Sequence, residues 1–182
     1  MKKLILILFT IAAMQVNAQL FVSNTSKVSF FSSTPVEDIS AENTSAKSVI
    51  NDANDTIIVR IKVINFKFPK PLMEEHFNEK YMESAKYPDA TFKGKISGTF
   101  DLTKNGTYNV TAKGKLLIHG VEQERTLAGT LTVKDGVITL DCKFKVKLVD
   151  HKIEVPSVVT SKIAETIDVH LNIAYKAYVK SN

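Results

Sequence analysis

The stretch KYPDATFKGKISGTF, residues 86–100, decides which class of fold the chain adopts. After its proline, apolar and polar residues alternate, which is the pattern of a β-strand with one buried face. The polar side carries lysine, serine and threonine, and the apolar side carries Phe92, Ile96 and Phe100. However, Gly94 and Gly98 also fall on the apolar side and bring no side chain to a core. Two interpretations are open: the glycines leave room for a ligand, or they let the sheet bend.

The same alternation extends through most of the chain. It predicts strands at residues 27–33, 36–43, 56–68, 90–100, 107–118, 126–133, 137–148 and 165–179. Lysines occupy the polar positions of several of these strands, so we expect the opposite faces to share one core. The pattern predicts an all-β protein of about eight antiparallel strands, arranged as a closed barrel or as a two-sheet sandwich. Within residues 56–68 the apolar parity slips, which indicates a bulge or burial on both faces.

Two dipeptides predict the connections between strands. Asn105-Gly106 and Asp135-Gly136 each stand between two predicted strands. Both dipeptides tolerate the positive φ angles that a two-residue hairpin requires. We therefore expect tight turns at both places, with neighbouring strands running antiparallel.

One predicted helix interrupts the strands, at residues 71–85. Pro71 suits the first helical turn, and Met73, Phe77 and Tyr81 recur every four residues. Such an amphipathic helix must dock its apolar side on another apolar surface. A second short helix near residues 157–164 is left open.

The first 18 residues have the features of a secretory signal peptide. Two lysines precede a short apolar run, and Ala18 offers a small residue before Gln19. The run is too short to span a bilayer comfortably, although an uncleaved anchor helix is the alternative. We expect cleavage after Ala18, which leaves residues 19–182 as one domain in the periplasm or secreted. No later run is long enough to span a membrane as a helix, and the alternating lysines disfavour an outer-membrane barrel.

The charged residues do not predict a nucleic-acid partner. The formal net charge is +5, but the lysines alternate with apolar residues along strands, and arginine occurs only at positions 60 and 125. We therefore interpret the lysines as a solvated face. The single cysteine, Cys142, has no partner for a disulfide within the chain. It shares its parity with Leu140 and Phe144, so we expect it to be buried and reduced.

Motifs for catalysis and metal binding are missing from the sequence. No zinc, dinucleotide, phosphate-loop or nucleophile-elbow pattern occurs. His119, beside Gly120, is expected to be a turn residue that bonds to local backbone, and the alternative is a catalytic base. We expect no catalytic residue, no metal and no cofactor.

Three segments together resemble one protein family. YPDATF (87–92), GKLLIHGVEQ (114–123) and MEEHFNEKYM (73–82) are similar to segments of the YceI family, the polyisoprenoid-binding proteins of lipocalin-like fold. Residues 26–43 and 155–171 are similar to that family's opening and closing segments. The resemblance implies an antiparallel eight-stranded lipocalin-like barrel, partly closed by the helix. It also implies export and a long apolar pocket for an isoprenoid chain, such as a quinone tail or a polyprenyl lipid.

The alternation of residues along the strands and the four-residue spacing along the helix then supply the candidate pocket residues. An unfilled core costs roughly 24 cal/mol per Å³ of cavity, so small inward residues beside large ones favour a ligand tunnel. The candidate ligand-binding residues are Phe66, Phe68, Met73, Phe77, Tyr81, Phe92, Gly94, Ile96, Gly98, Phe100, Tyr108, Val110, Ala112, Leu116, Ile118, Leu140, Phe144 and Val146.

These observations predict an exported, non-catalytic protein that carries, stores or sequesters a long apolar lipid. The expected ligand is a polyisoprenoid or an isoprenoid quinone, and a homodimer is left open. Two other functions remain open: an envelope interaction or scaffold protein without a lipid, and an isomerase or hydrolase that uses His119. Lipid carried by the purified protein would distinguish the first of these from a carrier.

Overall fold

The structure, a computed structural model, describes residues 19–157 and 160–179. The expected signal peptide over residues 1–18 lies outside the described residues. The described strands, in chain order, are β1 (Leu20–Ser33), β2 (Asp38–Asn43), β3 (Lys47–Asn51), β4 (Thr56–Lys62), β5 (Asp89–Ser97), β6 (Gly106–Ile118), β7 (Val121–Lys134), β8 (Val137–Lys147) and β9 (Thr166–Ala177).

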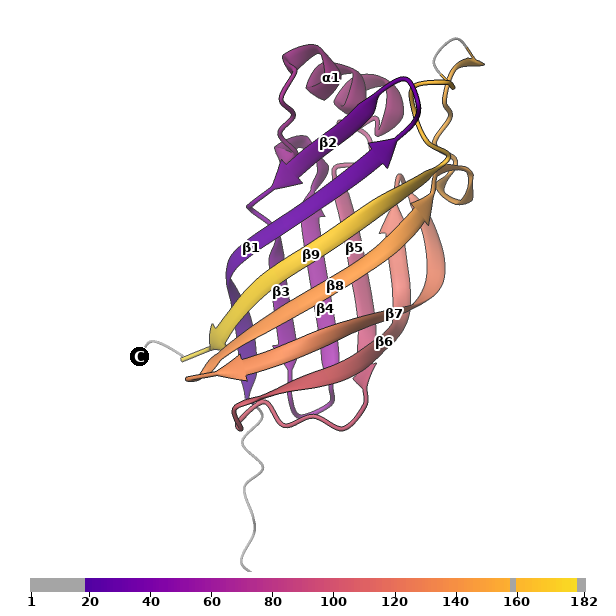
Figure 1. The fold of residues 1–182 in the computed structure, drawn as a ribbon. Helices are drawn as coiled ribbons and strands as arrows, with labels where there is room; N and C mark the ends of the chain where they lie inside the picture. The colour runs from indigo at the N-terminus through magenta and orange to yellow at the C-terminus, as the bar shows by residue number, and fades with distance from the viewer. Residues whose placement is uncertain (1–18, 158–159, 180–182) are drawn as a thin grey trace, which may run out of the picture.

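The strands form one antiparallel sheet that closes on itself (Figure 1). Its order is β2-β1-β3-β4-β5-β6-β7-β8-β9, and β1 also pairs with β9. Eight strands therefore make a closed barrel, and β2 is an extra strand outside the ring. The expected all-β, eight-stranded antiparallel barrel of lipocalin-like form is confirmed. Closure removes the exposed sheet edges that would otherwise pair with other chains.

The long strand β1 closes the barrel because one of its edges pairs with β9 and its other edge pairs with β3 and β2. Residues 20–22 of β1 pair with β3, whereas residues 28–33 pair with β2. The corner between β2 and β3 is held by Asn43, which is fully buried. Its Nδ2 donates to the Lys62 carbonyl at 2.9 Å, and its Oδ1 accepts from the Ser45 amide at 2.9 Å. β2 thus lies outside the ring of eight strands and extends over one end of the barrel (Figure 1).

The glycines of the opening stretch have a backbone role. Gly94 on β5 pairs with Gly114 on β6. A Cβ on Gly114 would overlap the Lys93 carbonyl, and a Cβ on Gly94 would come within 2.7 Å of the Phe92 ring. Gly98 has φ +135 just after β5 ends, a conformation that side chains rarely allow. The positive φ of Gly98 therefore supports the bend interpretation at that position, whereas Gly94 serves the close approach of β5 and β6.

The amphipathic helix is present but shorter than predicted. α1 (Pro71–His76) continues without a break as the π-helical turn η2 (Phe77–Tyr81). The helix ends there rather than at residue 85, because Glu83 has φ +42 and turns the chain toward β5. Of the expected second helix at 157–164, residues 158–159 lie outside the described residues, and 160–162 form turns. None of the helices in the described residues is long and apolar enough to cross a membrane.

The tight turns are partly as predicted. Asp135-Gly136 joins β7 to β8 with φ angles of 51° and 77°, which confirms that turn. The expected hairpin at Asn105-Gly106 is wrong, because β5 ends at Ser97 and a longer loop leads to β6. Asn105 instead accepts a hydrogen bond from the Asp135 amide at 3.0 Å. Its side chain thus stabilises the neighbouring turn between β7 and β8.

Candidate ligand-binding cavity

A cavity of about 560 Å³ lies inside the barrel. This volume is within the range of roughly 300–1,000 Å³ found for small-molecule sites. Seven of the barrel strands, β1 and β4 to β9, contribute side chains to its wall, together with β2, α1 and η2. Nearly all of these side chains are apolar. The wall therefore offers dispersion contacts and few hydrogen bonds, which suits a hydrocarbon chain.

Most of the residues predicted from parity lie on this wall. Those that line it are Phe66, Phe68, Met73, Phe77, Tyr81, Phe92, Ile96, Val110, Ala112, Leu116, Ile118, Leu140, Phe144 and Val146. Gly94, Gly98, Phe100 and Tyr108 do not line it. Gly94 is covered by the Phe92 ring, and Gly98 and Phe100 lie beyond the end of β5. Tyr108 packs at the far end of β6, where its hydroxyl donates to the Lys104 carbonyl.

The prediction missed a large part of the wall. The missed apolar residues include Val28, Phe30, Ile57, Val59, Ile61, Leu127, Leu131, Cys142, Ile167, Val169 and Leu171. Most of them carry the same period-two signal as the residues that were chosen. Parity alone would therefore have found them, but it would equally have selected inward residues that border no cavity.

Four phenylalanine rings cover one end of the cavity. After β4 the apolar positions of the sequence shift by one residue. The cause is a 3-10 turn, η1 (Val63–Asn65), which redirects Phe66 and Phe68 toward the helix. The ring of Phe77 lies 5.1 Å from that of Phe68 and 5.4 Å from that of Phe30 on β1. Such contacts between rings contribute beyond simple burial. They fix the apolar side of α1 and η2 over the barrel end, as the sequence predicted.

Three charged side chains and one histidine on the wall belong to this same end. Glu37 lies in the β1–β2 turn, and Lys70 and His76 belong to the helix and its start. Lys162 lies near the end of β1, because the Ala164 amide two residues later donates to Ser32 Oγ. Lys70 Nζ is 3.0 Å from Glu37 Oε1, which ties the β1–β2 turn to the helix. The mouth of the cavity is therefore polar, and its interior is apolar.

Cys142 is part of the apolar wall. It is 8% exposed, and its Sγ donates to the Ala128 carbonyl at 3.3 Å. Burial, together with the nearby Asp141 carboxylate, raises the pKa of Cys142 to about 11. The thiol is thus protonated at neutral pH and behaves as a small apolar group. The expectation of a buried, inward cysteine is confirmed.

His119 lies outside the cavity, in the tight turn between β6 and β7. The turn, with φ +50 at His119 and +73 at Gly120, was not predicted as a hairpin. Its Nδ1 lies 3.1 Å from the His151 carbonyl, and its Nε2 lies 3.0 Å from Glu83 Oε2. His119 is therefore a turn residue, as expected, and one of its partners is a backbone carbonyl, but both partners are distant in sequence and not local. His119 joins this turn to the end of the helix and to η3 (Leu148–His151).

A second histidine, His151, supports the same region. It is fully buried, and its Nδ1 lies 3.2 Å from the Val121 carbonyl. Burial lowers the pKa of His151, which favours a neutral ring at neutral pH. In the part of the chain that the structure describes, no three His, Cys, Asp or Glu residues gather closely enough to hold a metal ion.

Comparison with protein families identifies the barrel. A family model described as the YceI-like domain matches residues 14–175 of the chain. The chain belongs to the YceI-like domain family. The resemblance seen in the sequence is thereby confirmed. No curated protein matched the sequence at a significant level.

Solved structures share the fold of this YceI-like chain. One is a polyisoprenoid binding domain from Saccharophagus degradans implicated in plant cell wall breakdown, with a TM-score of 0.75 and 16% identity over 87% of this chain and 98% of that one. Burkholderia cenocepacia BcnA has a TM-score of 0.67 and 22% identity over 82% and 95% of the two chains. The Campylobacter jejuni YceI protein has a TM-score of 0.53 and 20% identity over 99% and 100%. At these identities the likeness establishes the fold alone.

Proposed function

We propose that this YceI-like protein binds a lipid and holds its apolar chain, of the polyisoprenoid class, inside the barrel. The observation that carries the proposal is the cavity of about 560 Å³, with apolar walls and a charged mouth. Each methylene group moved from water into such a wall contributes about 0.8 kcal/mol. A chain of several isoprene units therefore binds without any specific polar contact in the depth of the cavity. The naming of one fold neighbour as a polyisoprenoid binding domain supports the choice of ligand class.

We further propose that the protein binds this lipid without transforming it. The charged side chains on the described wall lie at the mouth, and the thiol of Cys142 is kept protonated by its raised pKa. His119, the one candidate for a catalytic base, does not line the cavity. A lipid chain in the barrel therefore meets no base or nucleophile at depth. Storage, transport or sequestration of a lipid requires neither a base nor a nucleophile.

The lipid content of the purified protein tests this function. We expect organic extraction followed by mass spectrometry to release a lipid with an isoprenoid chain, in an amount close to that of the protein. Protein stripped of this lipid should take up farnesol or a longer isoprenol. A scaffold without a ligand, which is the competing function, predicts empty protein that binds no isoprenol. That result would contradict the proposal.

Export is a separate part of the proposed function. The basic and apolar pattern of residues 1–18 supports removal of this segment after Ala18. We expect the protein recovered from the periplasm or the medium to begin at Gln19. Intact-mass measurement checks this directly. A full-length mass in the membrane fraction would instead support an uncleaved anchor.

A further inference from the structure

The cavity ends before the barrel does. On three adjacent strands, the last residue of the cavity wall is followed on the same face by a buried residue that does not line the cavity. These pairs are Leu131 and Val133 on β7, Leu140 and Ile138 on β8, and Leu171 and Ile173 on β9. The alternation of inward side chains continues past this point, but the empty space does not.

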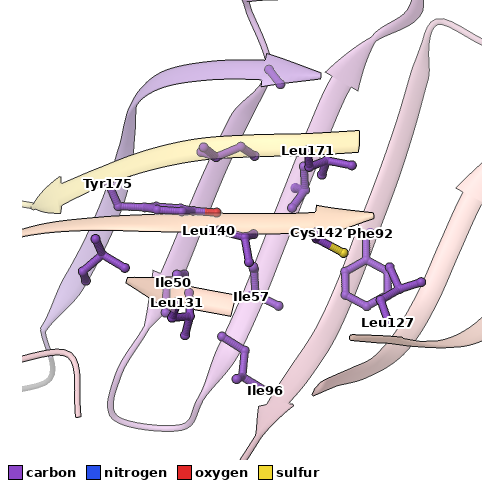
Figure 2. Close-up of a cluster of buried hydrophobic side chains, with 14 of the residues drawn as sticks. Ile50, Ile57, Phe92, Ile96, Leu127, Leu131, Leu140, Cys142, Leu171 and Tyr175 are labelled. Carbon is purple, nitrogen blue, oxygen red and sulfur yellow. The ribbon is translucent and has the colours of Figure 1, made fainter. Parts of the chain in front are cut away.

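Buried side chains occupy the remaining part of the barrel. Ile50, Ile138, Ile173 and Tyr175 are all 0% exposed. The hydroxyl of Tyr175 on β9 lies 2.7 Å from Ser48 Oγ on β3. These two strands flank β1 in the closed sheet, so the contact spans the inner side of β1. Figure 2 shows its ring pointing inward from β9, in the same cluster as Leu131 and Leu140. The cavity is therefore blind at this end.

We infer that Leu131 and Leu140 form a floor that sets the longest apolar chain the cavity buries. This inference rests on the proposed function. A lipid enters chain first through the mouth beside Lys70, because the opposite end is packed. Each further methylene group then strengthens binding about fourfold until the chain end reaches the floor. Any additional length stays outside the mouth in water and contributes nothing.

A series of saturated fatty alcohols, lengthened by two carbons at a time, measures this limit. The dissociation constant of each alcohol is determined for delipidated wild-type protein. We expect affinity to rise with chain length and then to stop rising at one defined length. In Leu131→Ala the limit should move one step longer. The first alcohol beyond the wild-type limit should then bind roughly tenfold more tightly than it binds wild type.

Ile138→Ala is the matched control. It truncates a side chain of equal size that is also 0% exposed, but this residue does not line the cavity. It should lose stability as Leu131→Ala does, yet keep the wild-type length limit. Val110→Phe provides a second test, because it adds a ring to the wall near the floor and should move the limit to shorter chains.

The outcomes separate the length limit from the function itself. If wild type binds the alcohols with no break in affinity, the floor does not set the length. The same holds if folded Leu131→Ala keeps the wild-type limit or if Ile138→Ala shifts it equally. Should Leu131→Ala fail to fold, an unchanged limit in folded Val110→Phe overturns the inference. Wild-type protein that binds none of the alcohols and no isoprenol overturns the proposed function.

Discussion

Ala112→Phe is expected to weaken lipid binding about a hundredfold while the barrel remains folded. Ala112 is half-buried on the cavity wall and lies in register between Ile96 of β5 and Leu127 of β7. A phenyl ring at this position occupies space that the lipid chain would fill. If it displaces about four methylene groups, the loss is about 3 kcal/mol, which corresponds to roughly a hundredfold in affinity. The ring itself is buried against the wall, so it offsets part of any strain.

Two measurements check this expectation. Lipid retained on purification is quantified by extraction, and the free energy of unfolding of delipidated protein is measured in urea. Lys113→Glu is the control, because Lys113 is exposed on the outer face of the same strand. It should retain a normal lipid load. A folded Ala112→Phe protein with full lipid content, or one that unfolds outright, would show that Ala112 does not border the binding space.

Gly114→Ala is expected to lower the free energy of unfolding by about 3 kcal/mol, at the upper end of overpacking effects. A Cβ at this position would overlap the Lys93 carbonyl and the Cα of Gly94 on the paired strand. Both are backbone atoms, so no side-chain rotation relieves the overlap. β5 and β6 would have to separate locally, and their ladder of hydrogen bonds would weaken.

The midpoint and slope of urea unfolding measure this loss. Gly106→Ala is a matched control, because its new Cβ would approach only the movable end of the Tyr108 side chain, at 3.0 Å. We expect this control to change the free energy of unfolding by less than about 1 kcal/mol. Equal stability of Gly114→Ala and wild type would show that the two strands are not held this closely.

The alternation of apolar and polar residues predicted most of the barrel, because the two-residue period of a strand is a local property. It found the cores of β4 to β9, the inward position of Cys142 and the apolar side of the helix. It missed β3 (Lys47–Asn51), which is too short to show a clear period. It also missed residues 20–26 of β1. Both segments acquire their strand structure from the strands that flank them in the sheet.

The dipeptide signals were less reliable, because a turn depends on where its flanking strands end. Asp135-Gly136 lies between strands that pair up to the turn, and it forms the expected hairpin. Asn105-Gly106 follows a strand that stops at Ser97. The positive φ of Gly98 bends the chain away there. The side chain of Asn105 stabilises the turn between β7 and β8 instead. The hydrogen-bond partners of His119 could not be predicted from the sequence either, because they lie 32 and 36 residues away along the chain.

By itself, the sequence determined which side chains point into the barrel. It also determined that a helix with an apolar side covers the barrel. Both conclusions follow from the residue periods of a strand and of a helix, which the local backbone sets. Only the tertiary structure decided which inward positions border empty space. That outcome depends on side chains from non-adjacent strands meeting inside the barrel, as Tyr175 of β9 meets Ser48 of β3 in the filled part. It also depends on how closely two backbones approach, as at Gly94 and Gly114. The depth of the cavity, and with it the length of chain that it holds, therefore follows from the closed barrel and not from any one strand.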